Sequence, residues 1–222
     1  MNIAENVLRL KQDFDSVFEN GQKAIWKFLT ADGTRENYTN AFQYVDLEYF
    51  EPQYDIAPTM ASYMYAQTNT GGYVDLAERF ERNGKKLDFS KCKGFTRAFY
   101  NSGVTRLGVI DCTSATSALD FTFGLSLQLH TIDKLIVDAD NTYSNTFSSD
   151  SALENIEVEG EIGNSISFGS CKKLTHASLM SIINHLQSKT SGTFTLTIGT
   201  DNLAKLTDAE KAIATQKGWT LA

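Results

Sequence analysis

The 222-residue sequence predicts an α/β fold, a short solenoid in which similar units of about 24 residues are stacked between dissimilar ends. Two observations lead to this prediction. The interval between Phe99 and Phe123 equals the interval between Phe123 and Phe147. Each phenylalanine is followed, eight or nine residues later, by a short apolar run that is typical of a β-strand. These runs begin at Leu107, Ile132 and Ile156.

The period also indicates the kind of solenoid. Units of about 20–29 residues are typical of leucine-rich repeats. One such unit is too small to bury its own apolar face, so the three phenylalanines are expected to stack on one another. A second repeat supports this interpretation: LDFSKCKGFTRAF, from Leu87, returns as ISFGSCKKLTHASL, from Ile166, at a distance close to three periods.

Residues 1–30 predict an amphipathic helix. Apolar residues and one glycine recur there at alternating spacings of four and three, which is the seam pattern of a coiled coil. The stripe consists of Ile3, Val7, Leu10, Phe14, Val17, Gly21, Ala24 and Phe28. Two interpretations stay open: the stripe packs on the core of its own chain, or it joins chains into a homo-oligomer.

Residues 31–84 are interpreted as a tyrosine-rich, irregular N-terminal cap. Seven of the nine tyrosines and both prolines lie in this segment. Tyrosine joins an apolar body to a polar tip, which suits half-buried positions and binding surfaces alike. The segment therefore either covers the first unit or presents a ligand surface, for which Tyr63 and Tyr65 are candidates.

Residues 85–222 are expected to contain the repeats and a helical C-terminal cap. Apolar residues spaced i, i+3, i+4 and i+7 predict a helix over 175–186, and alternation predicts a strand over 194–198. A capping box that begins at Thr207 predicts a last helix, which ends before Gly218. A dissimilar last unit would cover the final apolar face of the stack.

Several segments resemble a known family. LDFSKC, ALENIEV and ISFGSCKKL resemble the BspA-type leucine-rich repeats of bacterial surface and phage-encoded proteins. The closing KLTDAEKAIATQKGWTLA is similar to the C-terminal ends of such proteins in phages and prophages of gut bacteria, and the opening IAENVLRLKQDFDSVFENGQKA is similar to their N-terminal helix. The resemblance covers about residues 1–30 and 85–222, and the repeats here are few and irregular. It implies an interaction or adhesion module without catalysis.

Composition argues against several classes of protein. Hydrophobic residues make up 41% and charged residues 21% of the chain, as in an ordinary globular domain. The net charge of −7 opposes binding to nucleic acid. No stretch approaches the roughly 18 apolar residues of a membrane span. The start MNIAENVLRL has an acidic residue where a signal peptide would carry Lys or Arg, and no apolar region follows it, so we expect a chain that is cytoplasmic as synthesised, with association with a virion left open.

No residue pattern predicts a catalytic group, a cofactor or a metal ion. The sequence contains no G-x-S-x-G, H-E-x-x-H or Walker motif. Asp138-Ala-Asp140-Asn141 begins like a calcium loop, but the loop lacks the glycine and the glutamate that would complete it. The three histidines are not at metal-ligand spacings, and the three cysteines are interpreted as buried thiols.

We therefore predict a non-catalytic interaction, adhesion or scaffold module, encoded by a phage or prophage, whose partner is a protein or a surface glycan. The candidate partner surface combines solvent-facing strand residues with two tyrosines: Thr105, Arg106, Asp133, Lys134, Glu157, Glu159, Tyr63 and Tyr65. One alternative is a hydrolase or carbohydrate-binding protein that acts on surface polysaccharide through the tyrosine-rich segment. A second is a structural, oligomeric virion protein.

Overall fold

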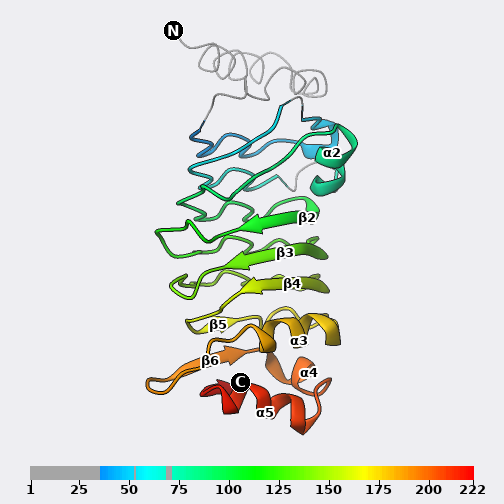
Figure 1. Ribbon diagram of the computed structural model, residues 1–222. Helices are drawn as coiled ribbons and strands as arrows, with labels where there is room; N and C mark the ends of the chain where they lie inside the picture. The colour runs from blue at the N-terminus through cyan, green and yellow to red at the C-terminus, as the bar shows by residue number, and fades with distance from the viewer. Residues whose placement is uncertain (1–35, 53, 69–71) are drawn as a thin grey trace.

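The computed structural model describes residues 36–52, 54–68 and 72–222 (Figure 1). The predicted amphipathic helix of residues 1–30 and its stripe lie outside this range. In chain order the regular elements are η3 (Leu47–Tyr49), β1 (Val74–Asp75), α2 (Leu76–Arg82), β2 (Val104–Asp111), β3 (Thr131–Val137), β4 (Asn155–Gly160), β5 (Ile166–Ser167), α3 (His176–Asn184), β6 (Phe194–Thr197), α4 (Gly199–Leu203), α5 (Asp208–Gln216) and β7 (Trp219–Leu221). The fold is α/β with parallel sheets.

The strands form two parallel sheets whose neighbours follow chain order. One sheet has the order β1-β2-β3-β4, and the other has the order β5-β6-β7. The three strands expected after the phenylalanines are confirmed as β2, β3 and β4, and they are in register: Leu107 pairs with Ile132, which pairs with Ile156. Figure 1 shows the turns of the chain stacked along one axis, and we call each turn a unit.

A column of stacked aromatic rings, the ring ladder, runs through the core. The predicted stacking of the three phenylalanines is confirmed, because the Phe123 ring lies 5.8 Å from that of Phe99 and 5.0 Å from that of Phe147. The interplanar angles of these two pairs are 9° and 19°. Each neighbouring ring therefore buries a face of Phe123, which a single unit could not do.

The ring ladder extends beyond the three equally spaced phenylalanines. It consists of Phe42, Tyr65, Phe99, Phe123, Phe147 and Phe168, each at most 2% exposed. Phe42 and Tyr65 stack with centroids 4.9 Å apart, and Tyr65 and Phe99 stack at 5.6 Å. The stacking therefore begins well before residue 85, inside the segment that the sequence predicts to be an irregular cap.

On the side of the stack away from the strands, the backbone makes two sharp bends in each unit, and hydrogen bonds link these segments of neighbouring units. Each of five successive units contains two non-glycine residues with positive φ, four positions apart. The pairs are Asn40 and Tyr44, Tyr63 and Gln67, Arg97 and Asn101, Phe121 and Leu125, and Asn145 and Ser149. The ring-ladder residue lies between the two residues of a pair, and in the first four pairs its backbone N–H donates a hydrogen bond to a carbonyl of the next unit. For example, the Phe99 N–H donates to the Thr122 carbonyl at 2.8 Å. Repeated left-handed residues of this kind cost free energy, and the surrounding hydrogen bonds maintain them.

The unit that contains β1 is longer than the units that follow it. Val74 pairs with Val104 in the next unit, and the Ser114 hydroxyl donates to the Ser90 carbonyl one unit before it. Both contacts join the same two units, but more residues separate Val74 from Val104 than separate Ser90 from Ser114. The additional residues therefore lie between β1 and Ser90. They form α2, which begins where the Asp75 carboxylate accepts the Glu78 N–H at 2.7 Å.

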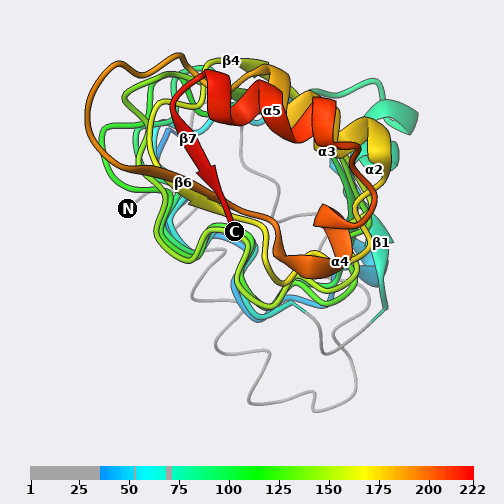
Figure 2. The same cartoon turned by 90° about the horizontal axis from the view of Figure 1, so that it is seen from below.

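The C-terminal end is closed by helices and by the second sheet. The helix predicted over 175–186 is α3, the strand predicted over 194–198 is β6, and the capping box at Thr207 starts α5 as predicted. The Trp219 ring is buried in β7, and its indole N–H donates to the Gln187 carbonyl at 2.8 Å. Viewed along the stack, the traces of successive units lie over one another, with α4, α5 and β7 across the near end (Figure 2).

Candidate binding surface

The charged residues predicted on the strands do lie together. The Arg106 guanidinium donates two hydrogen bonds to the Asp133 carboxylate, at 2.8 and 2.6 Å. Arg106 also contacts Asp75 at 3.5 Å and Glu81 at 3.2 Å. The hydrogen bond to Asp133 raises the pKa of Arg106, and the surrounding carboxylates add to this effect. The guanidinium joins β1, β2, β3 and the end of α2.

A second cation occupies the next pair of strands. The Lys134 ammonium on β3 contacts the Glu159 carboxylate at 2.7 Å and the Glu157 carboxylate at 3.8 Å, both on β4. The hydrogen bond to Glu159 raises the pKa of Lys134. The side chains of Glu157 and Glu159 are 64% and 54% exposed, so both carboxylates remain accessible to a partner.

The two clusters form one surface with an excess of negative charge, which we call the acidic strip. It contains two cations and five carboxylates, a net charge of −3: Arg106, Lys134, Asp75, Glu81, Asp133, Glu157 and Glu159. Thr105 lies beside it in β2 and is half-buried. Adjacent parallel strands lie about 4.8 Å apart, so the strip runs across β2, β3 and β4, with a register irregularity between Ile132 and Leu135.

The structure places the two candidate tyrosines differently. Tyr65 is predicted from the sequence to be a surface residue, and this assignment is wrong: its side chain is 0% exposed, because it occupies the rung of the ring ladder between Phe42 and Phe99. Tyr63 is half-buried and accepts a hydrogen bond from Arg97 at 3.0 Å. It lies in the turns that join the units and does not belong to the strand face of the acidic strip.

Arg97 is the centre of an aromatic cluster that the sequence reasoning did not identify. Its guanidinium lies over the rings of Tyr63, Tyr100 and Phe121, at 5.6, 5.4 and 5.3 Å from their centroids. Arg97 and Phe121 are separated by one full period of the repeat, so the period could have been used to predict that they are neighbours. Contacts of this geometry are attractive, and they hold three successive turns together.

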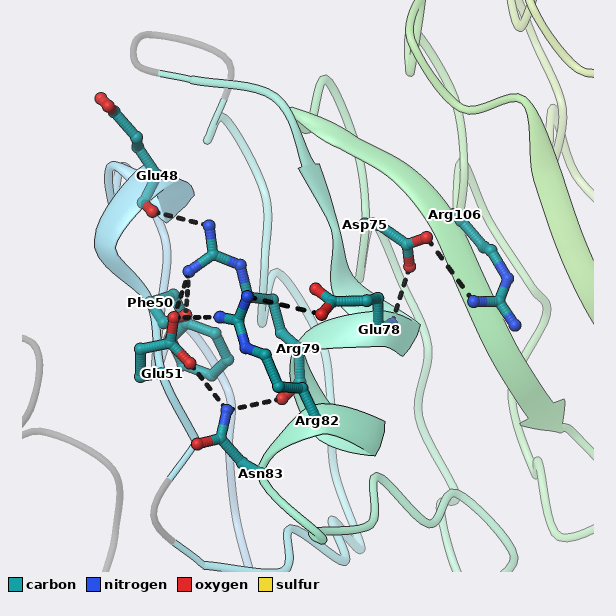
Figure 3. A network of polar contacts seen from close by, with 9 residues as sticks. All are labelled: Glu48, Phe50, Glu51, Asp75, Glu78, Arg79, Arg82, Asn83 and Arg106. Carbon is teal, nitrogen blue, oxygen red and sulfur yellow. Dashed lines mark hydrogen bonds and ion pairs between the residues drawn. The ribbon is translucent and has the colours of Figure 1, made fainter.

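Helix α2 is fixed to the unit above it by a polar network (Figure 3). Arg79 donates to the Glu48 carbonyl at 2.9 Å, to the Phe50 carbonyl at 3.2 Å and to the Glu51 carboxylate at 2.5 Å. Arg82 also pairs with Glu51, and the Asn83 amide donates to it at 2.7 Å. Partial burial raises the pKa of Glu51, but the hydrogen bonds and positive charges around it outweigh this effect and lower the pKa.

The loop that begins like a calcium site has its polar atoms directed at its own backbone. The Asp138 carboxylate accepts the Asp140 N–H at 2.9 Å. The Asn141 side chain accepts the Asp138 N–H at 2.9 Å and donates to the Cys112 carbonyl at 3.1 Å. These bonds close the turn after β3, as expected of Asp and Asn in turns.

Within residues 36–52, 54–68 and 72–222, no group of three or more His, Cys, Asp or Glu side chains could hold a metal ion. No helix in the same ranges has the length and apolar character needed to cross a membrane. The predicted burial of Cys92, Cys112 and Cys171 is confirmed.

No protein-family model, curated protein or solved structure matches this chain. The acidic strip and the helix beside it are therefore the features from which function can be inferred. They combine a rigid scaffold, exposed carboxylates and a net charge of one sign.

Proposed function

We propose that this protein is a non-catalytic interaction or scaffold module, a solenoid of the leucine-rich-repeat kind that binds a partner protein through the acidic strip. The observation that carries the proposal is the continuous row of charged side chains on β2, β3 and β4. The row stands on paired strands whose units also stack through buried rings, so we expect binding to need little reorganisation of the protein.

The partner would carry basic residues. Electrostatic complementarity accelerates association and selects partners of opposite charge. The strip has a net charge of −3, and the whole chain has a net charge of −7, so the local and the overall fields have the same sign. The resemblance to BspA-type repeats supports a phage- or prophage-encoded interaction or adhesion protein, as part of the same proposal.

The test uses a charge reversal that leaves the core untouched. Dodecapeptides selected against the purified chain by display are expected to be basic, and the selected peptide is then measured by calorimetry. Glu157→Lys should weaken binding by about tenfold or more, which corresponds to about 1.4 kcal/mol. The circular dichroism spectrum should not change, because the Glu157 side chain is 64% exposed.

A matched control separates a local effect from the change in net charge. Asp201→Lys changes the net charge by the same amount, at a carboxylate that is 56% exposed and lies in α4, away from the strip. We expect it to alter the affinity less than about twofold. Equal weakening by both variants would contradict a strip-specific site. Saturable hydrolysis of glycan, peptide or nucleotide, abolished by changing one histidine or carboxylate, would contradict the non-catalytic proposal.

A further inference from the structure

The first sheet has a free edge on the side of α2. Strand β1 pairs with only the beginning of β2, through Val74 with Val104 and Asp75 with Arg106. From Leu107 to Asp111, β2 pairs with β3 on one side, and within the described ranges no strand pairs with it on the other. A strand edge of this kind is a template for the addition of another strand.

The opposite edge of the same sheet is closed by side chains. Helix α3 packs against β4 and directs two serine hydroxyls at its backbone. The Ser178 hydroxyl accepts the Ile156 N–H, and the Ser181 hydroxyl accepts the Val158 N–H, both at 2.9 Å. Helix α2 instead buries apolar residues, Leu76, Ala77 and Phe80. The hydroxyls of α3 therefore satisfy backbone N–H groups at one edge, whereas the buried side chains of α2 beside the other edge are apolar.

An apolar cavity of about 380 Å³ separates α2 from the free edge. Its walls are the buried side chains of α2, the segment around Phe89, and residues 107–110 of β2. Val109, which lines the cavity, is 49% exposed, so part of the apolar lining is open to solvent. Cavities of this size and lining accept organic groups such as an apolar side chain.

The cavity is held open by the network that fixes α2. The helix arises from the additional residues of its unit, and Arg79 ties it to the Glu48 and Phe50 carbonyls (Figure 3). Gly108 lies opposite the helix, where an added Cβ would lie 3.6 Å from the Ala77 Cβ, an ordinary van der Waals contact. A larger side chain at residue 108 would thus extend into the space between β2 and α2.

The cavity opens directly beside the acidic strip. Glu81 belongs to both, since it lines the cavity and contacts Arg106 at 3.2 Å. Asp88, Asp111, Lys85 and Lys86 also line the cavity. An occupant that reaches from the cavity across the strip would therefore meet an apolar site and then a surface of net negative charge.

We propose that an extended segment of a partner protein adds as a strand to the free edge of β2, from Leu107 to Asp111, with one apolar side chain in the cavity and basic side chains at the near end of the acidic strip, beside Glu81 and Asp75. Strand addition combines main-chain hydrogen bonds with side-chain pockets, which matches the free edge and the cavity. This inference rests on the proposed function and names the part of the surface that would give it specificity.

The probe is the synthetic peptide acetyl-Lys-Thr-Val-Phe-Val-Lys-amide, added to the ¹⁵N-labelled full chain. Amide shifts are expected for residues 107–111 and for α2. Replacing the central Phe of the peptide with Ala should weaken binding by about tenfold or more, as should methylation of its backbone N–H groups. Unchanged affinity of either modified peptide, or shifts that avoid residues 107–111, would overturn the proposal, as would the absence of shifts at millimolar peptide.

Gly108→Leu, which adds a side chain to a residue that lines the cavity, should weaken binding of the probe by about tenfold or more. Thr220→Leu, which introduces the same side chain at an exposed position of β7, outside the cavity lining and the acidic strip, should leave it within about twofold. Equal affinity of wild type and Gly108→Leu would overturn strand addition here. If the display-selected peptide is then weakened by Glu157→Lys but not by Gly108→Leu, the proposed function stands and this inference fails. If neither variant weakens it, both fail.

Discussion

Replacing Phe123 with alanine is expected to lower the free energy of unfolding by about 3–5 kcal/mol. The side chain is 0% exposed, and its ring stacks on Phe99 and on Phe147. Removal of the ring takes away buried apolar area, and it also leaves a cavity between two units that the neighbouring rings cannot fill without moving. A loss of this size is a large fraction of the stability of an ordinary domain.

Denaturation by guanidinium chloride, followed by circular dichroism, measures this loss. Leu127→Ala is the matched control, because Leu127 is a large apolar residue close to Phe123 in the chain but is 50% exposed. Its expected cost is below about 0.5 kcal/mol. A cost below about 1 kcal/mol for Phe123→Ala would show that the stacked rings contribute little and that the core depends on other contacts.

The middle of the stack could be predicted from the sequence because identical residues recur at a constant interval there. Phe99, Phe123 and Phe147 define the period, and the apolar runs after them indicate the strands. The earlier rungs were missed for a physical reason. Phe42 and Tyr65 stack in the same column, but the interval from Tyr65 to Phe99 is much longer than the period. Insertions change the interval without changing the stacking.

The sequence could predict only the part of the candidate site in which strand pairing determines which side chains are neighbours. Arg106 and Asp133 meet diagonally across adjacent strands, since the register pairs Arg106 with Thr131. Lys134 reaches Glu159 on β4 diagonally as well, since Glu159 pairs with Ile136. The free edge of β2 and its cavity were not foreseen, since they depend on α2. That helix is short, seven residues, and its place is determined by contacts with the Glu48 and Phe50 carbonyls of an earlier unit. Such contacts leave no periodic signal.

A buried polar column runs beside the ring ladder. Three residues after successive rings, four polar side chains are at most 2% exposed: Thr68, Ser102, Ser126 and Asp150. The first three hydroxyls have hydrogen-bond partners, such as the Tyr65 carbonyl for Thr68, at 3.1 Å. At Asp150, the Oδ1 atom accepts the Ser126 N–H at 3.0 Å, whereas Oδ2 has no hydrogen-bond partner among the residues that the structure describes. A charge at this position would be costly.

Burial raises the pKa of Asp150 to about 9, although the hydrogen bond from the Ser126 amide lowers it in part. In the unfolded chain, the same carboxyl group ionises near its ordinary value of 3.8. Below that pH, Asp150 is protonated in both states and has no effect on stability. As the pH rises toward 9, the unfolded state releases a proton that the folded state retains, so stability falls by about 1.4 kcal/mol for each pH unit.

Asp150→Asn is therefore expected to remove this loss, because an amide has nearly the same shape and does not ionise. Relative to wild type, the variant should gain stability progressively between about pH 4 and pH 9, by several kcal/mol in total, and the difference should be constant at higher pH. Chemical denaturation at a series of pH values measures it. Asp208→Asn, at a fully exposed carboxyl group, provides the control and should change the stability by less than about 0.5 kcal/mol. A flat difference for Asp150→Asn would mean that Asp150 is ionised in the folded protein, with water or a cation reaching its second oxygen.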